Sequence, residues 1–332
     1  MKVKVLFQIV VSILVLTACS KEDGIVPSNA QDAPPVVKVD ATYEVLFEED
    51  IIYAEGLSHQ TRNSSSYSKL PLKLDIYTPN NKLENRPAFV FIHGGGFFGG
   101  SKQQSQILNF ANYYTSRGWV FISVDYRVKN DMGTVQQEWV SYYSSIPPNN
   151  IPQFLAIYPA QRDAKAAMRW TVAHAEAYNI NTDYITVGGG SAGAITAITL
   201  GISNQEDYRD EISLTQDPTL STTNLEQTYQ VQTIINFWGS KVALDILEGI
   251  YGHQRFDRND PPMFIAHGTE DPTVPFSSAE DLKAIYEANG IPLAYYPFEG
   301  YGHGAWNATV NNKRLEELTF DFIVEQQNLV LE

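Results

Sequence analysis

Short, mostly apolar segments recur along the chain from about residue 39, and each has the length of a β-strand. Segments 89–92, 120–124 and 264–266 are apolar almost throughout, which is typical of parallel strands buried on both faces. Segment 70–77 alternates clearly between apolar and polar residues and segment 43–53 loosely, as expected of edge strands with one face in water. The pattern predicts eight strands, at 43–53, 70–77, 88–93, 119–126, 184–189, 232–238, 263–267 and 293–298.

Helical patterns lie between these strands. Segment 162–178 places apolar or small residues on one stripe, and segment 278–289 ends at Gly290, which is typical of a helix C-terminus. Strands that alternate with helices imply an α/β fold, with a doubly wound, mostly parallel eight-stranded sheet and helices on both faces. The predicted helices are 103–117, 162–178, 278–289 and 305–327.

Two stretches, 128–158 and 204–229, fit neither pattern. Long irregular segments in a compact domain are usually functional loops or disordered. We expect the first stretch to contribute to a lid or a pocket wall. Its Trp139, Tyr142 and Tyr143 either pack that loop or supply an aromatic wall suited to sugar or phenolic groups, and the sequence leaves both interpretations open.

The N-terminal segment has a character of its own. Two lysines precede an apolar run at 5–16, and small residues then lead to Cys19. This arrangement is typical of a secretory signal peptide, which we predict at 1–18. Residues 16–19 resemble a bacterial lipobox, which implies lipid attachment at Cys19. We favour this over an ordinary signal with a chance cysteine, because Cys19 is the only cysteine and has no disulfide partner.

Residues 19–38 are polar and rich in Pro, Ser and acidic side chains, which predicts a flexible tether before a folded domain at 39–332. The formal charge of the chain is −15, and removal of the two lysines before Cys19 makes it −17. So negative a surface is poorly suited to nucleic acid or anionic headgroups. We therefore expect no nucleic-acid partner. We expect membrane contact through the lipid alone, in the cell envelope at an outer membrane, facing the periplasm or the cell surface.

A glycine-rich turn follows the predicted strand at 184–189. The residues G-G-S-A-G at 189–193 match Gly-x-Ser-x-Gly, and a helical pattern begins at Ala194. This arrangement is typical of a nucleophile elbow, with Ser191 as the nucleophile. Glycines two residues before and after the serine relieve crowding in a sharp turn, and the helix N-terminus helps to stabilise negative charge. A purely structural turn is the alternative.

A second glycine run, H-G-G-G-F at 93–97, directly follows an apolar strand. Three glycines allow backbone N–H groups to point at a ligand oxygen with no side chain in between. Acyl transfer needs such donors where oxyanion charge develops, and the loss of one raises the barrier by about 2.7–4 kcal/mol. We expect His93 to hold this loop and not to react; a flexible turn is the alternative.

Both glycine runs also match G-x-G-x-x-G, at 94–99 and 188–193. In the first run, bulky residues at 97–98 come before the helix. Ribose binding requires an acidic residue at a strand end about twenty residues further on, and the second run has none there. No Gly-Lys-Ser/Thr follows either run. Spacings of metal ligands such as H-E-x-x-H or C-x-x-C are also absent from the sequence. We therefore expect neither a nucleotide, nor a metal, nor another cofactor.

A serine nucleophile needs a base, and the base needs an acid that orients it. Among the six histidines, His303 lies in a glycine-rich loop between the last strand and the last helix, where an imidazole would face a pocket. Asp271 follows a buried strand and is the favoured acid, with Glu270 as a near rival and Asp245 as a remote one.

Five motifs follow one another along the chain: H-G-G-G-F at 93–97, S-V-D-Y-R at 123–127, G-G-S-A-G at 189–193, H-G-T-E-D-P-T-V-P at 267–275 and G-H at 302–303. In this order they resemble the motifs of the α/β-hydrolase esterases. The most similar groups are the hormone-sensitive-lipase-like carboxylesterases and related bacterial carbohydrate esterases, acetyl-xylan or feruloyl. The likeness spans about residues 68–325 and is more specific for fold and reaction type than for substrate.

The resemblance implies an α/β-hydrolase fold for a catalytic domain at 39–332 and a serine ester hydrolase that needs no cofactor. It implies Ser191 as nucleophile, His303 as base and Asp271 as the orienting acid, in the chain order of this fold. The implied oxyanion donors are the N–H groups of Gly94 or Gly95 and of Ala192.

The resemblance also implies that residues 125–127 form a structural motif at a strand end. Two positions depart from the family pattern. Gly190 stands where many relatives carry Asp or Glu before the serine, and Ala194 replaces a frequent glycine. Neither change removes a catalytic group, but both blur the subfamily.

The substrate class remains open between acyl esters of carbohydrates, acetyl or feruloyl, and a broad range of short-chain esters. A peptidase of the prolyl-oligopeptidase type shares the triad, but usually carries a large extra domain that this chain cannot hold. A catalytically inactive binding lipoprotein is the remaining alternative. The presence of Ser191, Asp271 and His303 together argues against it.

Overall fold

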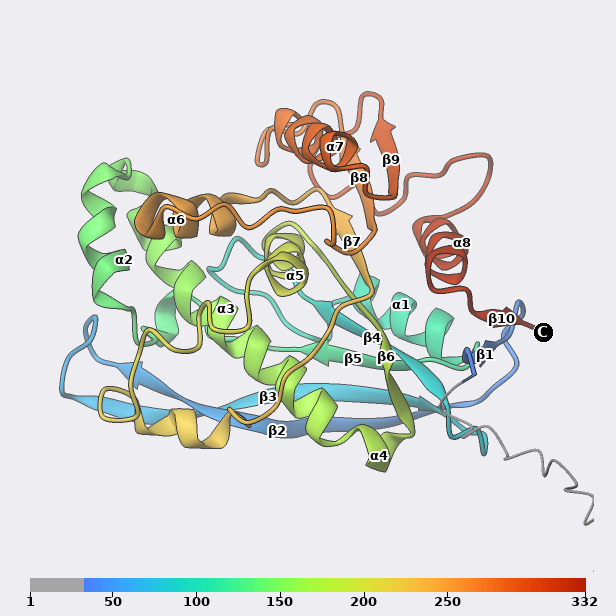
Figure 1. Cartoon of the computed structure of the whole chain (residues 1–332), viewed down its shortest axis with the longest axis horizontal. Coiled ribbons are helices and arrows are strands. Elements are labelled where there is room, and N and C mark those ends of the chain that lie inside the picture. The colour runs from blue at the N-terminus through green and yellow to red at the C-terminus, as the bar shows by residue number, and fades with distance from the viewer. Residues whose placement is uncertain (1–32) are drawn as a thin grey trace, which may run out of the picture.

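The computed structural model describes residues 33–332. At its centre lies an eight-stranded sheet in the order β2-β3-β5-β4-β6-β7-β8-β9 (Figure 1). The β2–β3 and β3–β5 pairs are antiparallel and all other neighbours are parallel, so the predicted mostly parallel sheet is confirmed. The strands are β2 (Val45–His59), β3 (Tyr67–Pro79), β4 (Arg86–Ile92), β5 (Val120–Val124), β6 (Ile180–Gly190), β7 (Thr233–Phe237), β8 (Met263–Gly268) and β9 (Leu293–Phe298).

The place of β3 in the sheet differs from the expectation. Its alternating pattern predicts an edge strand, which is wrong, because β3 lies between β2 and β5. β5 pairs only with the residues from Leu74 to Tyr77, so the first half of β3 has β2 as its single neighbour. That first half, up to Pro71, is exposed or half-buried, whereas the half paired with β5 is mostly buried. The alternation therefore reflects the part of β3 that protrudes beyond β5.

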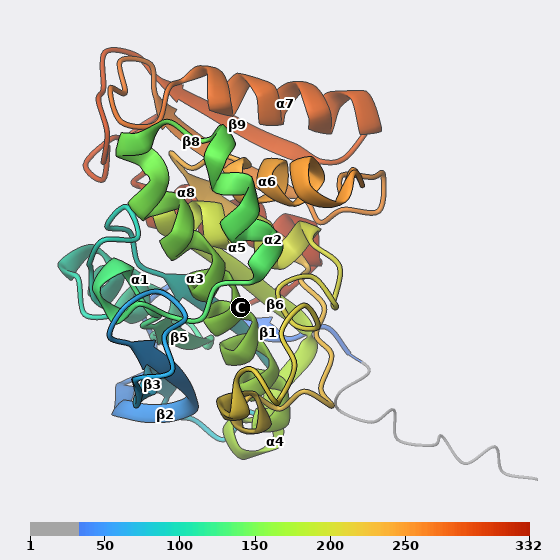
Figure 2. The ribbon, with the colours of Figure 1, turned by 90° about the vertical axis from the view of Figure 1, so that its left-hand side faces the viewer.

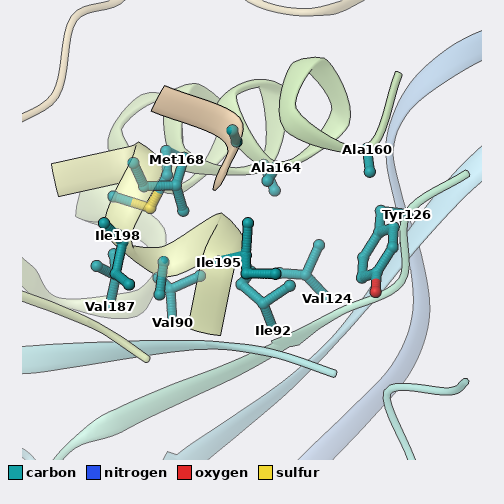
Figure 3. Packing of buried hydrophobic residues seen from close by; sticks show 14 of the residues in the cluster. Val90, Ile92, Val124, Tyr126, Ala160, Ala164, Met168, Val187, Ile195 and Ile198 are labelled. Carbon is teal, nitrogen blue, oxygen red and sulfur yellow. The ribbon is translucent and has the colours of Figure 1, made fainter. Parts of the chain in front are cut away.

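Helices cover both faces of the sheet, as predicted. One buried cluster joins α1 and α8 to one face, and a second joins α3, α5, α6 and α7 to the other. In Figure 3, Met168 of α3 and Ile198 of α5 pack over Val90 and Val187 of the central strands. The helices are α1 (Ser105–Thr115), α2 (Gln137–Tyr142), α3 (Ile151–Ala173), α4 (Ala175–Tyr178), α5 (Ala192–Ile202), α6 (Val242–Tyr251), α7 (Ser277–Asn289) and α8 (Leu315–Gln327).

The segment 128–158 is more regular than its sequence pattern predicts. It holds α2, which packs beside the N-terminal half of α3 (Figure 2), and α3 itself begins at Ile151 and not at 162. Almost every residue from Phe154 to Thr171 is buried, so α3 lacks the polar stripe from which a helical period is recognised. The segment also holds three short 3₁₀ helices, η1 (Lys129–Asp131), η2 (Tyr143–Ser145) and η3 (Pro148–Asn150).

Two further helices differ from the sequence pattern, and one segment agrees with it. α6 was not predicted, and α8 begins at Leu315 and not at 305 because a loop with a Val310–Lys313 bridge precedes it. The segment 204–229 is irregular, as predicted, apart from the 3₁₀ helix η4 (Pro218–Thr222). Within residues 33–332, no helix combines the length and the apolar character that crossing a bilayer requires.

The two ends of the described chain meet in a small sheet of their own. β1 (Val36–Val37) pairs in parallel with β10 (Val330–Leu331), and Lys38 forms an ion pair of 2.9 Å with Glu332. Ordered structure therefore begins before residue 39, inside the last residues of the predicted tether. The predicted signal peptide at 1–18 and the predicted lipid attachment at Cys19 lie outside the described residues.

Candidate active site

Ser191 lies on a sharp turn between the C-terminal end of β6 and the first residue of α5. Its backbone is in an unusual conformation, with φ 57° and ψ −121°, which is a strained state for a residue that is not glycine. The flanking glycines allow this turn to pack. A Cβ at Gly189 would lie 2.5 Å from the backbone of Gly193, and one at Gly193 would lie 2.0 Å from the Ile92 carbonyl oxygen. The glycines of the motif are therefore required by close backbone approach.

The structure brings the three predicted side chains into one hydrogen-bonded chain. His303 Nε2 lies 2.9 Å from Ser191 Oγ, and His303 Nδ1 lies 2.8 Å from Asp271 Oδ2. The other carboxylate oxygen of Asp271 accepts hydrogen bonds from the amides of Thr273 and Val274, at 2.8 and 3.0 Å. The Asp271 side chain is fully buried, whereas the His303 side chain is 25% exposed. A carboxylate fixed in this way can orient an imidazole that remains open to a ligand.

The rival acids lie elsewhere. Glu270 is exposed, and Asp245 is an exposed residue of α6 that forms an ion pair with Lys241 at 2.5 Å. Neither is hydrogen-bonded to His303. Among the candidates from the sequence, the geometry thus favours Asp271.

A second histidine lies behind Asp271. His267, at the end of β8, is fully buried, and its Nε2–H donates to the Val274 carbonyl at 2.9 Å. The same nitrogen is 3.3 Å from Asp271 Oδ2. Burial lowers the pKa of His267, which favours the neutral ring. His267 is therefore structural, and its contact with Asp271 is a feature that the sequence pattern did not reveal.

The loop from His93 to Gly100 approaches Ser191 from the neighbouring strand β4. A Cβ at Gly94 would lie 2.7 Å from the Gly190 carbonyl oxygen and 3.5 Å from Ser191 Cβ. Gly95 and Gly96 have positive φ, at 132° and 63°, which turns the loop without side-chain interference. The start of the loop, at Gly94, is thus held close to the serine.

His93 holds this loop through its contacts with Gly94 and Tyr126. Its Nδ1 forms a hydrogen bond of 2.8 Å with the Gly94 carbonyl, and its ring stacks on Tyr126 with the centroids 4.3 Å apart. The Tyr126 hydroxyl donates to the His93 carbonyl at 3.0 Å. The ring of His93 is almost completely buried and forms no hydrogen bond with Ser191. The geometry therefore gives His93 a holding role, as expected.

The strand-end motif at 125–127 is structural in its contacts. Arg127 is buried and pairs with the buried Asp163 of α3, through distances of 2.6 and 2.9 Å to its two carboxylate oxygens. Arg127 also donates to the Leu57 carbonyl of β2 at 2.9 Å. The Asp125 carboxylate accepts a hydrogen bond from the Lys102 amide at 2.6 Å. These bonds connect the strand end to its neighbours, beside the loop that begins at His93.

A cavity of about 350 Å³ opens above Ser191. One of its walls is aromatic: Trp238 and Trp306 meet edge to face, with ring centroids 4.6 Å apart. This wall needs a glycine before the nucleophile, because a Cβ at Gly190 would lie 2.8 Å from the Trp306 ring. The lining residues are Gly94, Gly95, Gly96, Gln104, Gly190, Ser191, Trp238, Thr273, His303, Gly304 and Trp306.

The sequence pattern does not reveal this aromatic wall, and the aromatic residues that it singles out lie elsewhere. Trp139 is fully buried against Phe154 of α3, with ring centroids 5.0 Å apart, and Tyr142 packs on the same ring. Neither lines the Ser191 cavity, so they pack the segment 128–158. The departure of Gly190 from the family pattern was the signal that could have pointed to large side chains nearby. Within residues 33–332, there is no group of three or more His, Cys, Asp or Glu side chains placed to hold a metal.

Known proteins resemble the chain in both sequence and structure. Esterase LipC of Mycobacterium tuberculosis is 23% identical over 66% of this chain and 53% of its own length, and Esterase LipQ of the same organism is 23% identical over 75% and 58%. The chain thus spans a little over half the length of these curated relatives.

Solved structures of Thermogutta terrifontis esterase 2 have the same α/β-hydrolase fold. The form phosphorylated by paraoxon matches with a TM-score of 0.56 and 25% identity, over 83% of this chain and 95% of that one. The propionate-bound form gives the same TM-score and identity, over 86% and 94%. The predicted α/β-hydrolase fold is therefore confirmed.

The family model named BD-FAE matches residues 74–139 and 141–249, more than half of the chain. This match includes the loop after β4, Ser191 and the strand-end motif at 125–127, and ends before Asp271 and His303. The chain belongs to the BD-FAE family.

Proposed function

We propose that this protein is a serine-type carboxylic ester hydrolase. The observation that carries the proposal is the continuous hydrogen-bonded chain from Ser191 Oγ through the His303 ring to the buried Asp271 carboxylate. The esterases among its relatives and structural neighbours support the same reaction class.

In this mechanism His303 Nε2 takes the proton of Ser191 as its Oγ attacks the ester carbonyl. The amides of Gly94 or Gly95 and of Ala192 hold the negative charge that develops on the carbonyl oxygen. The alcohol leaves with the proton from His303, and water then releases the acid from the acyl-serine. Every step uses groups of this chain, the substrate and water.

The proposed substrates are esters with a short acyl group. The cavity of about 350 Å³ next to Ser191, with Trp238 and Trp306 in one wall, has room for such a group. The propionate bound to Thermogutta terrifontis esterase 2 supports this preference. Acetyl or feruloyl esters of carbohydrates are the second candidate class. Its supporting observation is the half-buried Trp306 in the cavity wall, whose ring is a surface that a sugar or a phenol can contact.

Hydrolysis of 4-nitrophenyl acetate by the full-length protein in detergent tests the proposal. Ser191→Ala removes the nucleophile, so kcat should fall by at least about a thousandfold. Ser221→Ala is the matched control, because Ser221 is an exposed serine of η4 whose hydroxyl donates to the Pro218 carbonyl, and the kcat of this variant should equal that of the unmodified protein. Absence of hydrolysis by the folded protein would favour a non-catalytic binding protein. Comparison of acetylated xylan with a feruloylated sugar then separates the substrate classes.

We also propose that the protein is lipid-anchored in the cell envelope through Cys19. The support is the sequence at 16–19 and the absence of a second cysteine. Cys19→Ser should abolish incorporation of labelled palmitate and release the protein from membranes. Membrane association that is unchanged in this variant would contradict the anchor without affecting the proposed reaction.

A further inference from the structure

A second cavity, of about 310 Å³, lies apart from Ser191. Three segments enclose it: the connection between β2 and β3, the residues after β5, and the first turns of α3, which gather at one end of the molecule (Figure 1). Its walls are apolar side chains, namely Val128, Met132, Val135, Ile151, Leu155 and Pro159. Cavities of this size and character take small apolar groups.

The charged residues around this cavity are both cations. Arg62 and Lys129 belong to its lining, and no aspartate or glutamate does, although the whole chain carries a formal charge of −15. Within residues 33–332, the charged groups of these two side chains contact aromatic rings only. The Arg62 guanidinium lies 5.5 Å from the centroid of the Tyr143 ring, and the Lys129 ammonium lies 5.1 Å from that of the Phe98 ring.

The carboxylate of Asp131, two residues along the chain, forms no ion pair with Lys129. Asp131 accepts a hydrogen bond from the Val128 amide at 2.7 Å and lines a different cavity, between β3 and the residues after β5. Both cations are therefore available to a ligand with negative charge. Arg and Lys bind a carboxylate through charge-assisted hydrogen bonds.

The cavity also lies behind the loop that lines the Ser191 cavity. The Lys129 amide donates to the Phe97 carbonyl at 2.8 Å, and Gln153 Nε2 donates to the Gly96 carbonyl at 3.1 Å. Gly96 lines the Ser191 cavity, whereas Lys129 lines the apolar one, as does Pro152, which precedes Gln153. The two cavities share no lining residue and are thus separate sites.

We propose that the apolar cavity is a second binding site, for a small amphipathic carboxylate. The apolar body of the ligand, an aromatic ring or a short alkyl chain, fills the cavity between β2–β3 and α3. Its carboxylate binds Arg62 and Lys129. This assignment does not depend on the proposed ester hydrolysis at Ser191.

Calorimetric titration of the full-length protein with 4-phenylbutyrate and with 4-phenylbutan-1-ol tests the site. The two probes share an apolar body, and only the first carries a negative charge. We expect the double variant Arg62→Gln, Lys129→Gln to bind phenylbutyrate about tenfold more weakly and to bind the alcohol unchanged. The matched control, Lys82→Gln with Arg258→Gln, removes two exposed cations outside the cavity lining and should leave both affinities unchanged.

Tryptophan substitutions that fill the cavity provide a second test of the site. Leu155→Trp and, separately, Ile151→Trp should each weaken both probes by at least about tenfold, because both positions are half-buried and line the cavity. Thermal unfolding checks that each variant is folded. Ser191→Ala should bind both probes as the unmodified protein does.

Three results would overturn the proposal. These are no phenylbutyrate binding at millimolar concentration, equal loss of both probes in the charge variant, or undiminished binding in both folded tryptophan variants. Competition by a fluorophosphonate adduct on Ser191 would place the ligand in the other cavity and also overturn it. Failure of the hydrolysis assay would leave these binding results unaffected, so the two proposals can fail separately.

Discussion

At the scale of single residues, the site depends on the absence of a side chain at Gly190. Trp306 and Trp238 occupy the space in which a side chain at position 190 would lie, so the glycine and the two tryptophans form one unit. The sequence predicted Ser191, Asp271 and His303 as the site residues, because each follows a strand end in a recognisable motif. It could not identify the tryptophans, since their approach to Gly190 is a contact between segments that are far apart in sequence.

This unit leads to a prediction about size at position 190. Gly190→Ala should lower kcat/KM for 4-nitrophenyl acetate about tenfold, because its Cβ would lie 2.8 Å from the Trp306 ring and displace it. Trp306→Ala removes that collision, so the double variant should lose less than the sum of the two single losses expressed as free energies. Additive losses would show that the two positions are not coupled. Kinetics of the three variants decide between these outcomes.

At the scale of elements, the buried Arg127–Asp163 pair connects the end of β5 to α3. The sequence predicted the strand, but it placed the start of α3 too late, because a helix buried on all sides has no apolar–polar period. The pairing itself was also outside the reach of the sequence, since the partners are 36 positions apart and one of them lies on that helix.

Removing one partner of this pair should destabilise the fold strongly. Asp163→Ala leaves the buried guanidinium of Arg127 without its carboxylate, which should lower the free energy of unfolding by about 3–5 kcal/mol. The double variant Arg127→Met, Asp163→Leu should recover most of that loss. Asp281→Ala, at an exposed position of α7, is the control and should change the value by less than about 0.5 kcal/mol. Urea unfolding measures all four, and a small loss in Asp163→Ala would contradict the structural role of the pair.

At the scale of the whole molecule, the eight strands and the parallel arrangement were predictable, because buried parallel strands are short apolar runs. The strand order and the pairing of β1 with β10 were not predictable, since they depend on contacts between distant segments.

One buried charge opposes the stability of the fold, and the sequence pattern does not reveal it. Lys165 of α3 is buried, with its ammonium donating to the Asn204 carbonyl at 2.5 Å, and burial lowers its pKa to about 7.

The buried Lys165 predicts a pH dependence of global stability. In the unfolded chain a lysine keeps its proton up to about pH 10.4, whereas in the folded protein it begins to lose it near pH 7. The unfolded state therefore binds more protons between these values, and stability should rise with pH by up to about 1.4 kcal/mol per pH unit. Lys165→Met should be more stable than the unmodified protein at pH 7, with a difference that shrinks toward pH 10. A difference independent of pH, in urea unfolding at four pH values, would contradict this account.

The central claim is that Ser191 is the nucleophile, activated by His303 and Asp271. Stoichiometric labelling with a fluorophosphonate, followed by mass spectrometry of the proteolytic peptides, tests it most directly. The account predicts one adduct per chain, on Ser191, which is absent in Ser191→Ala and forms much more slowly in His303→Ala. An adduct on another residue, or no adduct on the folded protein, would contradict it.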